Sequence, residues 1–133
     1  MSARRVTYLD SSAIVKLAVR EPESTALRTH LRRRHPLVSS ALARTEVVRA
    51  LSPLGDQAIR RGLDVLSTLN LVRITDRVLT VAGELQPPEL HSLDAIHLAT
   101  AQQFDAELNH IVTYDARMAI AARSLGLRVA APA

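Results

Sequence analysis

Four acidic residues, which we call the acidic quartet, stand where their carboxylates could act on one substrate: Asp10, Glu46, Asp94 and Asp115. Asp10 and Asp115 each follow a short apolar, β-branched run and precede a helical pattern, so each is expected at the carboxyl end of a strand. Ligand sites of open α/β sheets lie along that edge. Carboxylates within about 6 Å of one another repel, and Mg²⁺ offsets the repulsion. The quartet therefore predicts a divalent-metal site.

Two members of the quartet also have an ordinary structural explanation. Asp10 comes just before a helix expected to begin near Ser12, and Asp115 comes just before a helix expected over Ala116–Leu125. A carboxylate at either position can cap the helix by accepting backbone N–H bonds. Neither residue alone indicates catalysis.

The other two members are expected on helices. Asp94 falls one or two residues inside a helix that Ser92 would cap, where a carboxylate meets the positive end of the helix dipole. Glu46 could form a surface ion pair with Arg49. Because only a parallel sheet could bring all four acids together, the functional interpretation depends on the fold.

The elements that would position the quartet alternate along the chain. Apolar runs bounded by polar residues predict strands at Val6–Leu9, Leu37–Ser39, Leu71–Ile74, His110–Thr113 and Arg128–Ala130. A spacing of 3.6 residues predicts helices around Ile14, Leu17 and Ala18, around Ala43, Val47, Ala50 and Leu51, around Ile59, Leu63, Leu66 and Leu69, and over Arg77–Leu85 and Leu93–Phe104. This alternation indicates an α/β fold with a central parallel sheet of about five strands flanked by helices. With 133 residues, 47% of them hydrophobic, one domain over residues 1–133 is expected.

Composition excludes several kinds of site. The chain has no cysteine, which excludes disulfides, thiolate metal sites and cysteine nucleophiles, and fits a cytoplasmic location. No apolar run approaches the roughly 20 residues that span a bilayer, so no membrane association is expected. One Phe and two Tyr are too few to stack RNA bases on an aromatic platform. RNA, if bound, would be bound through its backbone.

Arginine supplies nearly all of the positive charge. The net charge is +4, and Lys16 is the one lysine among 17 basic residues. Guanidinium groups meet phosphate oxygens through a planar fork of donors. The runs Arg32–Arg34 and Arg60–Arg61 are therefore candidate phosphate contacts, although both could equally be solvated helix faces.

The histidines give a weaker signal. His97 lies about one turn after Asp94 and could contact the quartet, but a histidine on a mostly apolar helix is more often packed and hydrogen-bonded to backbone. The others show no metal-ligand spacing, so zinc is not expected. They are His30, His35, His91 and His110.

Four stretches of the chain resemble the PIN-domain nucleases, and most closely the VapC-type toxins of bacterial toxin–antitoxin pairs. They are Tyr-Leu-Asp-Ser-Ser-Ala-Ile-Val-Lys-Leu at 8–17, Glu46 with Val47 and Val48, Leu-Asp-Ala-Ile-His-Leu-Ala-Thr-Ala at 93–101, and Val-Thr-Tyr-Asp at 112–115. With length and strand–helix order, the resemblance covers essentially the whole chain. It implies a PIN-like three-layer fold.

The resemblance also implies an activity and partners. It assigns the quartet to catalysis and to binding of Mg²⁺, or of Mn²⁺ in its place, in an endoribonuclease that hydrolyses RNA phosphodiester bonds, with Ser12 and Thr113 as supporting hydroxyls. The metal would activate a water near the RNA phosphorus. Met118 stands where the family more often has Leu or Phe, and no further acid follows Asp115, so one metal ion is better supported than two. The implied partners are RNA and a small cognate antitoxin, in a homodimer or a toxin–antitoxin hetero-oligomer.

An antitoxin tail would need an apolar groove near the quartet. The Ile14–Leu17–Ala18 face and the helix near Leu42–Val48 flank Asp10 and Glu46 and are the candidates. The alternative is that these faces are buried in the core.

Two rival functions stay open. A phosphatase or phosphotransferase of the haloacid-dehalogenase type would use Asp10 as a nucleophile, but such enzymes usually carry a second acid two residues later, where this chain has Ser12. A non-catalytic module with a PIN-like fold would bind RNA or protein without cleavage. In that case the quartet would serve only as caps and ion pairs.

Overall fold

The computed structural model describes residues 5–133, and its five strands form one all-parallel sheet. The strand order is β3-β2-β1-β4-β5. The strands are β1 (Val6–Leu9), β2 (Leu37–Ser40), β3 (Asn70–Val72), β4 (Leu108–Val112) and β5 (Val129–Ala130). This sheet confirms the predicted α/β fold class.

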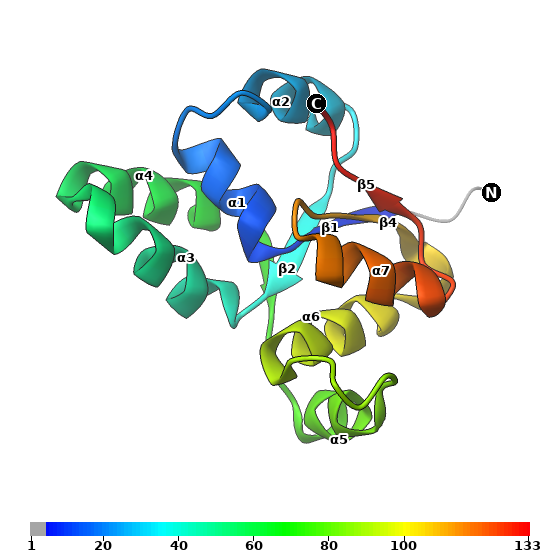
Figure 1. Ribbon diagram of the computed structural model, residues 1–133. Helices are drawn as coiled ribbons and strands as arrows, with labels where there is room; N and C mark the ends of the chain where they lie inside the picture. The colour runs from blue at the N-terminus through cyan, green and yellow to red at the C-terminus, as the bar shows by residue number, and fades with distance from the viewer. Residues whose placement is uncertain (1–4) are drawn as a thin grey trace.

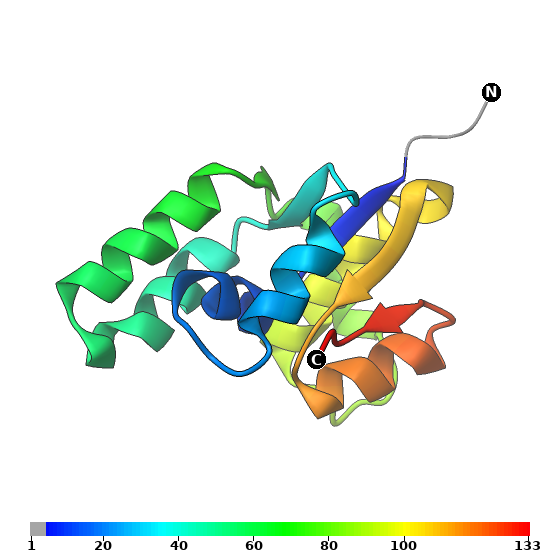
Figure 2. The same ribbon diagram turned by 90° about the horizontal axis from the view of Figure 1, so that it is seen from above.

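Helices cover both faces of the sheet (Figures 1 and 2). Helices α1 to α4 share a core with one face, α6 and α7 pack on the other, and α5 packs against α6. The α-helices are α1 (Ser11–Ala18), α2 (Ser24–Leu31), α3 (Ala43–Leu51), α4 (Asp56–Ser67), α5 (Asp76–Glu84), α6 (Ser92–Gln102) and α7 (Ala116–Ser124). Two 3-10 turns, η1 (Ser52–Leu54) and η2 (Asp105–Glu107), complete the elements. Within residues 5–133, no helix is both long and apolar enough to cross a bilayer.

The central strand β1 is buried on both faces, which explains its continuous apolar run. Its side chains alternate between the two cores: Leu9 packs with α1 and α3, whereas Tyr8 packs with α6 and α7. In the parallel pairing of β1 with β4, Leu9 lies opposite Val112. Asp10 and Thr113 therefore leave the sheet side by side at its carboxyl edge.

Several details differ from the sequence expectations, most of them by one or two residues at the end of an element. Helix α2 was not predicted, because its buried residues Ser24, Leu27 and Leu31 are separated by polar ones. Leu63 is 49% exposed, and α4 instead buries Ala58, Gly62 and Leu66.

Gly62 explains the change of face on α4. A Cβ at this position would lie 2.5 Å from Cδ1 of Leu51, so α3 approaches α4 closest where α4 has no side chain. The third strand is also displaced: it covers Asn70–Val72 rather than Leu71–Ile74, and Thr75 then caps α5.

Candidate active site

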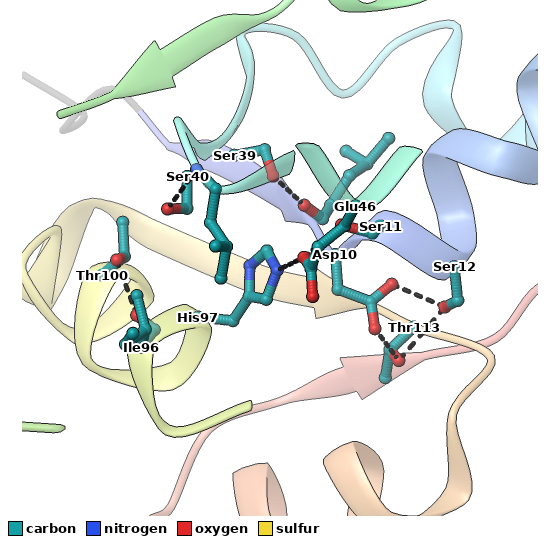
Figure 3. A network of polar contacts seen from close by, with 12 residues as sticks. Asp10, Ser11, Ser12, Ser39, Ser40, Glu46, Ile96, His97, Thr100 and Thr113 are labelled. Atoms are coloured by element: carbon teal, nitrogen blue, oxygen red, sulfur yellow. Dashed lines mark hydrogen bonds and ion pairs between the residues drawn. The ribbon is translucent and has the colours of Figure 1, made fainter. Parts of the chain in front are cut away.

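Asp10 is the most buried member of the quartet, with 4% of its surface exposed. It caps α1 by accepting a hydrogen bond from the Ala13 amide (3.1 Å), as expected. It also accepts from the hydroxyls of Ser12 (2.6 Å) and Thr113 (2.5 Å) (Figure 3). Burial raises the pKa of the Asp10 carboxyl even though these hydrogen bonds oppose the rise. The carboxylate is thus held rigidly in a place where its charge is costly.

Ser12 and Thr113 join the start of α1 to the end of β4. Besides binding Asp10, Ser12 Oγ accepts from the Tyr114 amide (2.9 Å), and Thr113 Oγ1 accepts from the Asp115 amide (3.1 Å). The two hydroxyls therefore fix the strand end that carries Asp115 relative to Asp10. The structure brings both predicted supporting residues to the quartet.

Glu46 projects from α3 toward the same edge, and both of its bonds fall on one oxygen. Its Oε1 accepts from Ser11 Oγ and from His97 Nε2, each at 2.6 Å (Figure 3). Burial alone would raise the pKa of Glu46, but the hydrogen bonds from His97 and Ser11 lower it below its ordinary value. The predicted surface ion pair between Glu46 and Arg49 is wrong, because Glu46 pairs with His97 instead.

His97 lies 2% exposed between Glu46 and Tyr8. The Tyr8 hydroxyl lies 2.7 Å from Nδ1, and the two rings meet edge-on. Because ionised Glu46 can only accept, Nε2 carries the hydrogen, and in the neutral ring Tyr8 donates to Nδ1. The prediction that His97 is packed is right. The prediction that its partners are backbone groups is wrong, since both are side chains.

Asp94 and Asp115 complete the quartet on the helices α6 and α7. Asp115 caps α7, accepting from the amides of Arg117 (2.9 Å) and Met118 (3.3 Å). Burial raises the pKa of Asp94, and the negative charges of Asp115 and Asp10 raise it further. The negative charges of two other members of the quartet therefore act on Asp94. Ser92 does not cap α6, because the helix begins at Ser92 and its N-cap is His91.

Few positively charged side chains form ion pairs with the quartet. The ion pairs among residues 5–133 join Lys16 to Glu21 and Glu23, and His97 to Glu46. Three of the four acids therefore have no ion-pair partner in this part of the chain. Repulsion of this kind favours binding of a cation.

A hard divalent cation fits the chemistry of these donors, which are all oxygens. Each carboxylate oxygen offers two lone pairs. Oδ1 of Asp10 and Oε1 of Glu46 each accept two hydrogen bonds, so Asp10 Oδ2 and Glu46 Oε2 keep free capacity. Within residues 5–133, however, no three Asp, Glu or His side chains form a group spaced to hold a metal ion. Ligation by several acids at once would require their side chains to draw closer together.

A groove of about 580 Å³ opens beside Asp94. Its wall contains apolar side chains, among them Ile120, which is 68% exposed. Arg117 and His91, 3.3 Å apart, stand at the same groove. Asp94 is therefore reachable from solvent by a molecule with both apolar and anionic parts.

The apolar faces expected to receive an antitoxin tail are largely buried. Ile14, Ala18, Ala43 and Val47 belong to the core, so that expectation is wrong for these residues. The apolar side chains that are exposed near an acid of the quartet are Leu93 (48%) and Ile120 (68%). They flank Asp94 on the helices α6 and α7.

Sequence reasoning missed two residues of this site. Ser11 bonds Glu46, and Tyr8 bonds His97. Ser11 stands between Asp10 and Ser12, so its proximity to the quartet could have been inferred. Tyr8 carried no signal, because it lies 89 residues from His97.

Comparison with known proteins shows to which family the chain belongs. Residues 7–124 match the family described as PIN domain. Ribonuclease VapC46 of Mycobacterium tuberculosis (strain ATCC 25618 / H37Rv) is 61% identical over 125 residues, covering 94% of this chain and 96% of that protein. Ribonuclease VapC35 of the same strain is 41% identical over 129 residues, with the same coverage.

Solved structures match in fold at lower identity. A toxin–antitoxin complex from Klebsiella pneumoniae has a TM-score of 0.72 at 22% identity, covering 99% of this chain and 98% of that one. Mycobacterium tuberculosis VapC20, described as a sarcin-ricin loop cleaving toxin, also gives 0.72, at 14% identity, covering 86% and 94%. The length of the family match and the identity to two VapC proteins decide the assignment: this chain belongs to the PIN-domain family and to its VapC members.

Proposed function

We propose that this protein is a metal-dependent endoribonuclease, formed by one nuclease domain and acting in the cytoplasm as the toxin of a toxin–antitoxin pair. One observation carries the proposal: Asp10, Asp94 and Asp115 lie together at the carboxyl edge of a parallel sheet, none of them has an ion-pair partner within residues 5–133, and a groove reaches Asp94. The relatives named above are called ribonucleases, which supports RNA as the substrate class.

The quartet would hold Mg²⁺, or Mn²⁺ in its place, and the bound ion would supply Lewis-acid chemistry at a phosphodiester. The protein's own residues prepare the oxygens. Ser12 and Thr113 fix Asp10, and the cap of α7 fixes Asp115. His97 and Ser11 occupy Oε1 of Glu46, so that Oε2 keeps its lone pairs free for a ligand. Such preorganisation lowers the cost of gathering like charges.

The partner proposal is a small antitoxin that covers the groove beside Asp94, in a toxin–antitoxin hetero-oligomer or on a toxin homodimer. The similarity in fold to a chain of a toxin–antitoxin complex supports it. The exposed Ile120 and Leu93 give an apolar partner segment something to bury, and the acids offer a place for an arginine of that segment.

Cleavage of a mixed RNA substrate with and without chelator tests the activity. EDTA should abolish cleavage and added Mg²⁺ or Mn²⁺ should restore it, whereas Asp94→Asn should stay inactive under both conditions. Asp64→Asn, on the exposed face of α4, is the matched control and should behave as wild type. RNA binding without any cleavage in Mg²⁺ would favour the non-catalytic module. Cleavage that persists in EDTA would contradict the metal site.

Co-expression tests the partner. The protein purified with the neighbouring gene product should carry a small protein and cleave poorly, and cleavage should rise after that protein is removed. Ile120→Glu should weaken this complex without changing cleavage by the free toxin by more than about twofold. A complex unaffected by Ile120→Glu would place the partner elsewhere.

A further inference from the structure

Two histidines that the proposed reaction does not use meet between α2 and β4. Nε2 of His30 lies 2.8 Å from Nε2 of His110, with the rings edge-on and their centroids 5.0 Å apart. His110 is 7% exposed. Sequence spacing had given no reason to pair them, because they are 80 residues apart.

Two arginines stand at the same place. Arg34 Nη1 donates to the His30 carbonyl (2.7 Å), and Arg128 donates to the carbonyl (3.2 Å) and side-chain oxygen (3.0 Å) of Asn109. These bonds hold each guanidinium beside the histidine pair and leave other N–H groups of both side chains free. All five residues line one open depression of about 300 Å³, together with Val129 and Ala130 of β5.

The charge around the pair is positive and uncompensated. The pKa of His110 is lowered to about 4, first by burial and then by the charges of His30, Arg34 and Arg128. Burial and Arg34 lower the pKa of His30. Within residues 5–133, no carboxylate contributes to the pKa shift of either histidine. The depression therefore disfavours a metal cation and favours an anion.

Counting hydrogens shows what the pair can offer such an anion. In the neutral pair one Nε2–H donates to the other Nε2, so one ring carries a hydrogen on Nδ1 and the other has a lone pair there. Neither Nδ1 has a partner among residues 5–133, and no unpartnered side-chain nitrogen of this part of the chain is buried, so both reach solvent. One added proton would occupy the free Nδ1 lone pair. It would give two Nδ1–H donors and leave the bond between the rings intact.

We propose that His30, Arg34, His110 and Arg128 form a binding site for a phosphate group, and that the histidine pair takes up one proton when the phosphate binds. A tetrahedral oxyanion has acceptors for both guanidinium groups and for one Nδ1–H group. The other Nδ1–H points away, because the bond between the two Nε2 atoms places the Nδ1 atoms at opposite ends of the pair. The charge of the anion then favours the added proton on either ring. The site is separate from the acidic quartet and does not depend on the proposed ribonuclease activity.

Sulfate and inorganic phosphate are the probes, with binding followed by the imidazole resonances of the full chain in NMR titrations. Sulfate keeps its charge between pH 5.5 and 7.5, so its affinity reports the protein's protonation alone. We expect sulfate affinity to rise toward low pH, by up to about tenfold per pH unit. Affinity for sulfate that does not change with pH would overturn the proton uptake.

Arginine variants test the site itself. Arg34→Gln and Arg128→Gln should each weaken sulfate and phosphate binding at least about fivefold. Arg77→Gln is the matched control, because it removes an exposed guanidinium on α5 that does not line this site. Equal effects of all three substitutions would show a general charge effect and overturn the proposal.

A histidine variant separates proton uptake from packing. In His30→Gln the amide N–H can replace the bond to His110, but the side chain cannot take up a proton. We expect an unchanged melting temperature in the absence of anions and a weaker pH dependence of the sulfate affinity, because only His110 stays titratable. In the double variant His30→Gln, His110→Gln the sulfate affinity should not change with pH. A pH dependence that survives in the double variant would assign the proton to another group and contradict the proposal.

Binding of single-stranded RNA, measured in EDTA, shows whether the bound phosphate belongs to RNA or is free phosphate. If an RNA phosphate occupies the site, the log–log salt slope of RNA binding should fall by about 0.7 in Arg34→Gln and stay unchanged in Arg77→Gln, on the exposed face of α5. An unchanged slope in Arg34→Gln, together with lost sulfate binding, would identify free phosphate as the ligand.

Discussion

Two histidines buried at the sheet, His97 and His110, meet opposite surroundings. Each lies less than 10% exposed and edge-on to another ring, Tyr8 for His97 and His30 for His110. His97 points its Nε2 at the carboxylate of Glu46. His110 points its Nε2 at a second imidazole, with Arg34 and Arg128 nearby.

The contrast shows that the neighbouring charge, rather than burial, decides what a buried histidine does. Next to Glu46, the imidazole is a fixed donor that aims one carboxylate oxygen. Between arginines, the imidazole pair is short of negative charge and can respond to anions and protons. The following predictions test this difference between the two centres, from the largest effect to the smallest.

Neutralising Asp10 should have the largest effect on the acidic centre. Asp10→Asn keeps an acceptor for Ala13 and Ser12, and its amide can donate to Thr113, yet it removes the charge. RNA cleavage should fall at least about 100-fold. Because burial raises the folded-state pKa of Asp10, its ionisation opposes folding above that pKa, so the variant should be as stable as wild type or more stable at pH 7.

Thermal unfolding with and without Mg²⁺ checks the stability effect. Mg²⁺ should raise the melting temperature of wild type and not of Asp10→Asn. Asp10→Ala, which also loses the cap of α1, should cost about 0.5–2 kcal/mol of stability. A cap-only role would leave Asp10→Asn fully active.

Removing the histidine that holds Glu46 should have the next largest effect. His97→Ala should lower cleavage about 10- to 100-fold, the usual cost of losing a partner of a metal ligand, and should weaken binding of Mg²⁺ measured without RNA. In His97→Gln, the amide N–H can replace Nε2–H, so activity should recover in part.

Tyr8→Phe extends the same test one residue deeper. It leaves Nδ1 of His97 without its donor and should shift the imidazole ¹⁵N resonances, with a loss of Mg²⁺ affinity. Tyr114→Phe is the matched control, because its hydroxyl donates to the Pro132 carbonyl away from His97. Equal losses of Mg²⁺ affinity in the two variants would argue against a specific role of Tyr8.

The site formed by His30, His110, Arg34 and Arg128 should instead affect how the free energy of unfolding depends on pH. The pKa of His110 falls from 6.5 to about 4 on folding, so the unfolded chain binds more protons in that window, and stability should decrease as the pH drops through it. Solvent screening limits the loss to roughly 1–2 kcal/mol. Urea unfolding at several pH values measures it.

Two comparisons sharpen this result. His110→Asn should flatten the dependence between pH 6.5 and 4, whereas Asn109→Ala should not. Sulfate should reduce the loss in wild type, since an anion offsets the charge of the protonated pair. Identical curves for wild type and His110→Asn would remove His110 from the explanation.

The smallest effect should come from Ser11. Ser11→Ala removes one of the two donors to Glu46 Oε1 and leaves the bond from His97. Because a hydrogen bond contributes about 1 kcal/mol on average and the bond from His97 still holds the carboxylate, cleavage should fall only about threefold to tenfold. Ser67→Ala, whose hydroxyl donates to the Asp64 carbonyl on the exposed end of α4, should be silent.

Local sequence patterns predicted the framework that carries the quartet. The run before Asp10 matches β1, and alternation of strands with helices predicted the parallel sheet. Once β1 and β4 are neighbours, the register alone places Asp10 beside Thr113. Helix α2 escaped prediction because its three buried residues do not form a continuous apolar pattern.

Partners of the histidines could not be predicted in the same way. His97 bonds residues 51 and 89 positions away, and His30 lies 80 positions from His110. No periodicity links such residues, because the packing of α3, α6 and β1 sets their separation. Asp10 and Asp115 were found through their place at strand ends, and Asp94 and Glu46 through the family resemblance; the histidines have no comparable signal.

The lengths of the outer strands bear on how copies of this protein can associate. The sheet ends in β3 with three residues on one side and β5 with two on the other. A strand edge becomes a template for aggregation when it presents a long row of unpaired backbone groups. Neither edge presents such a row, so joining sheets edge to edge is disfavoured even at high concentration. Self-association must instead use side-chain surfaces on the helices.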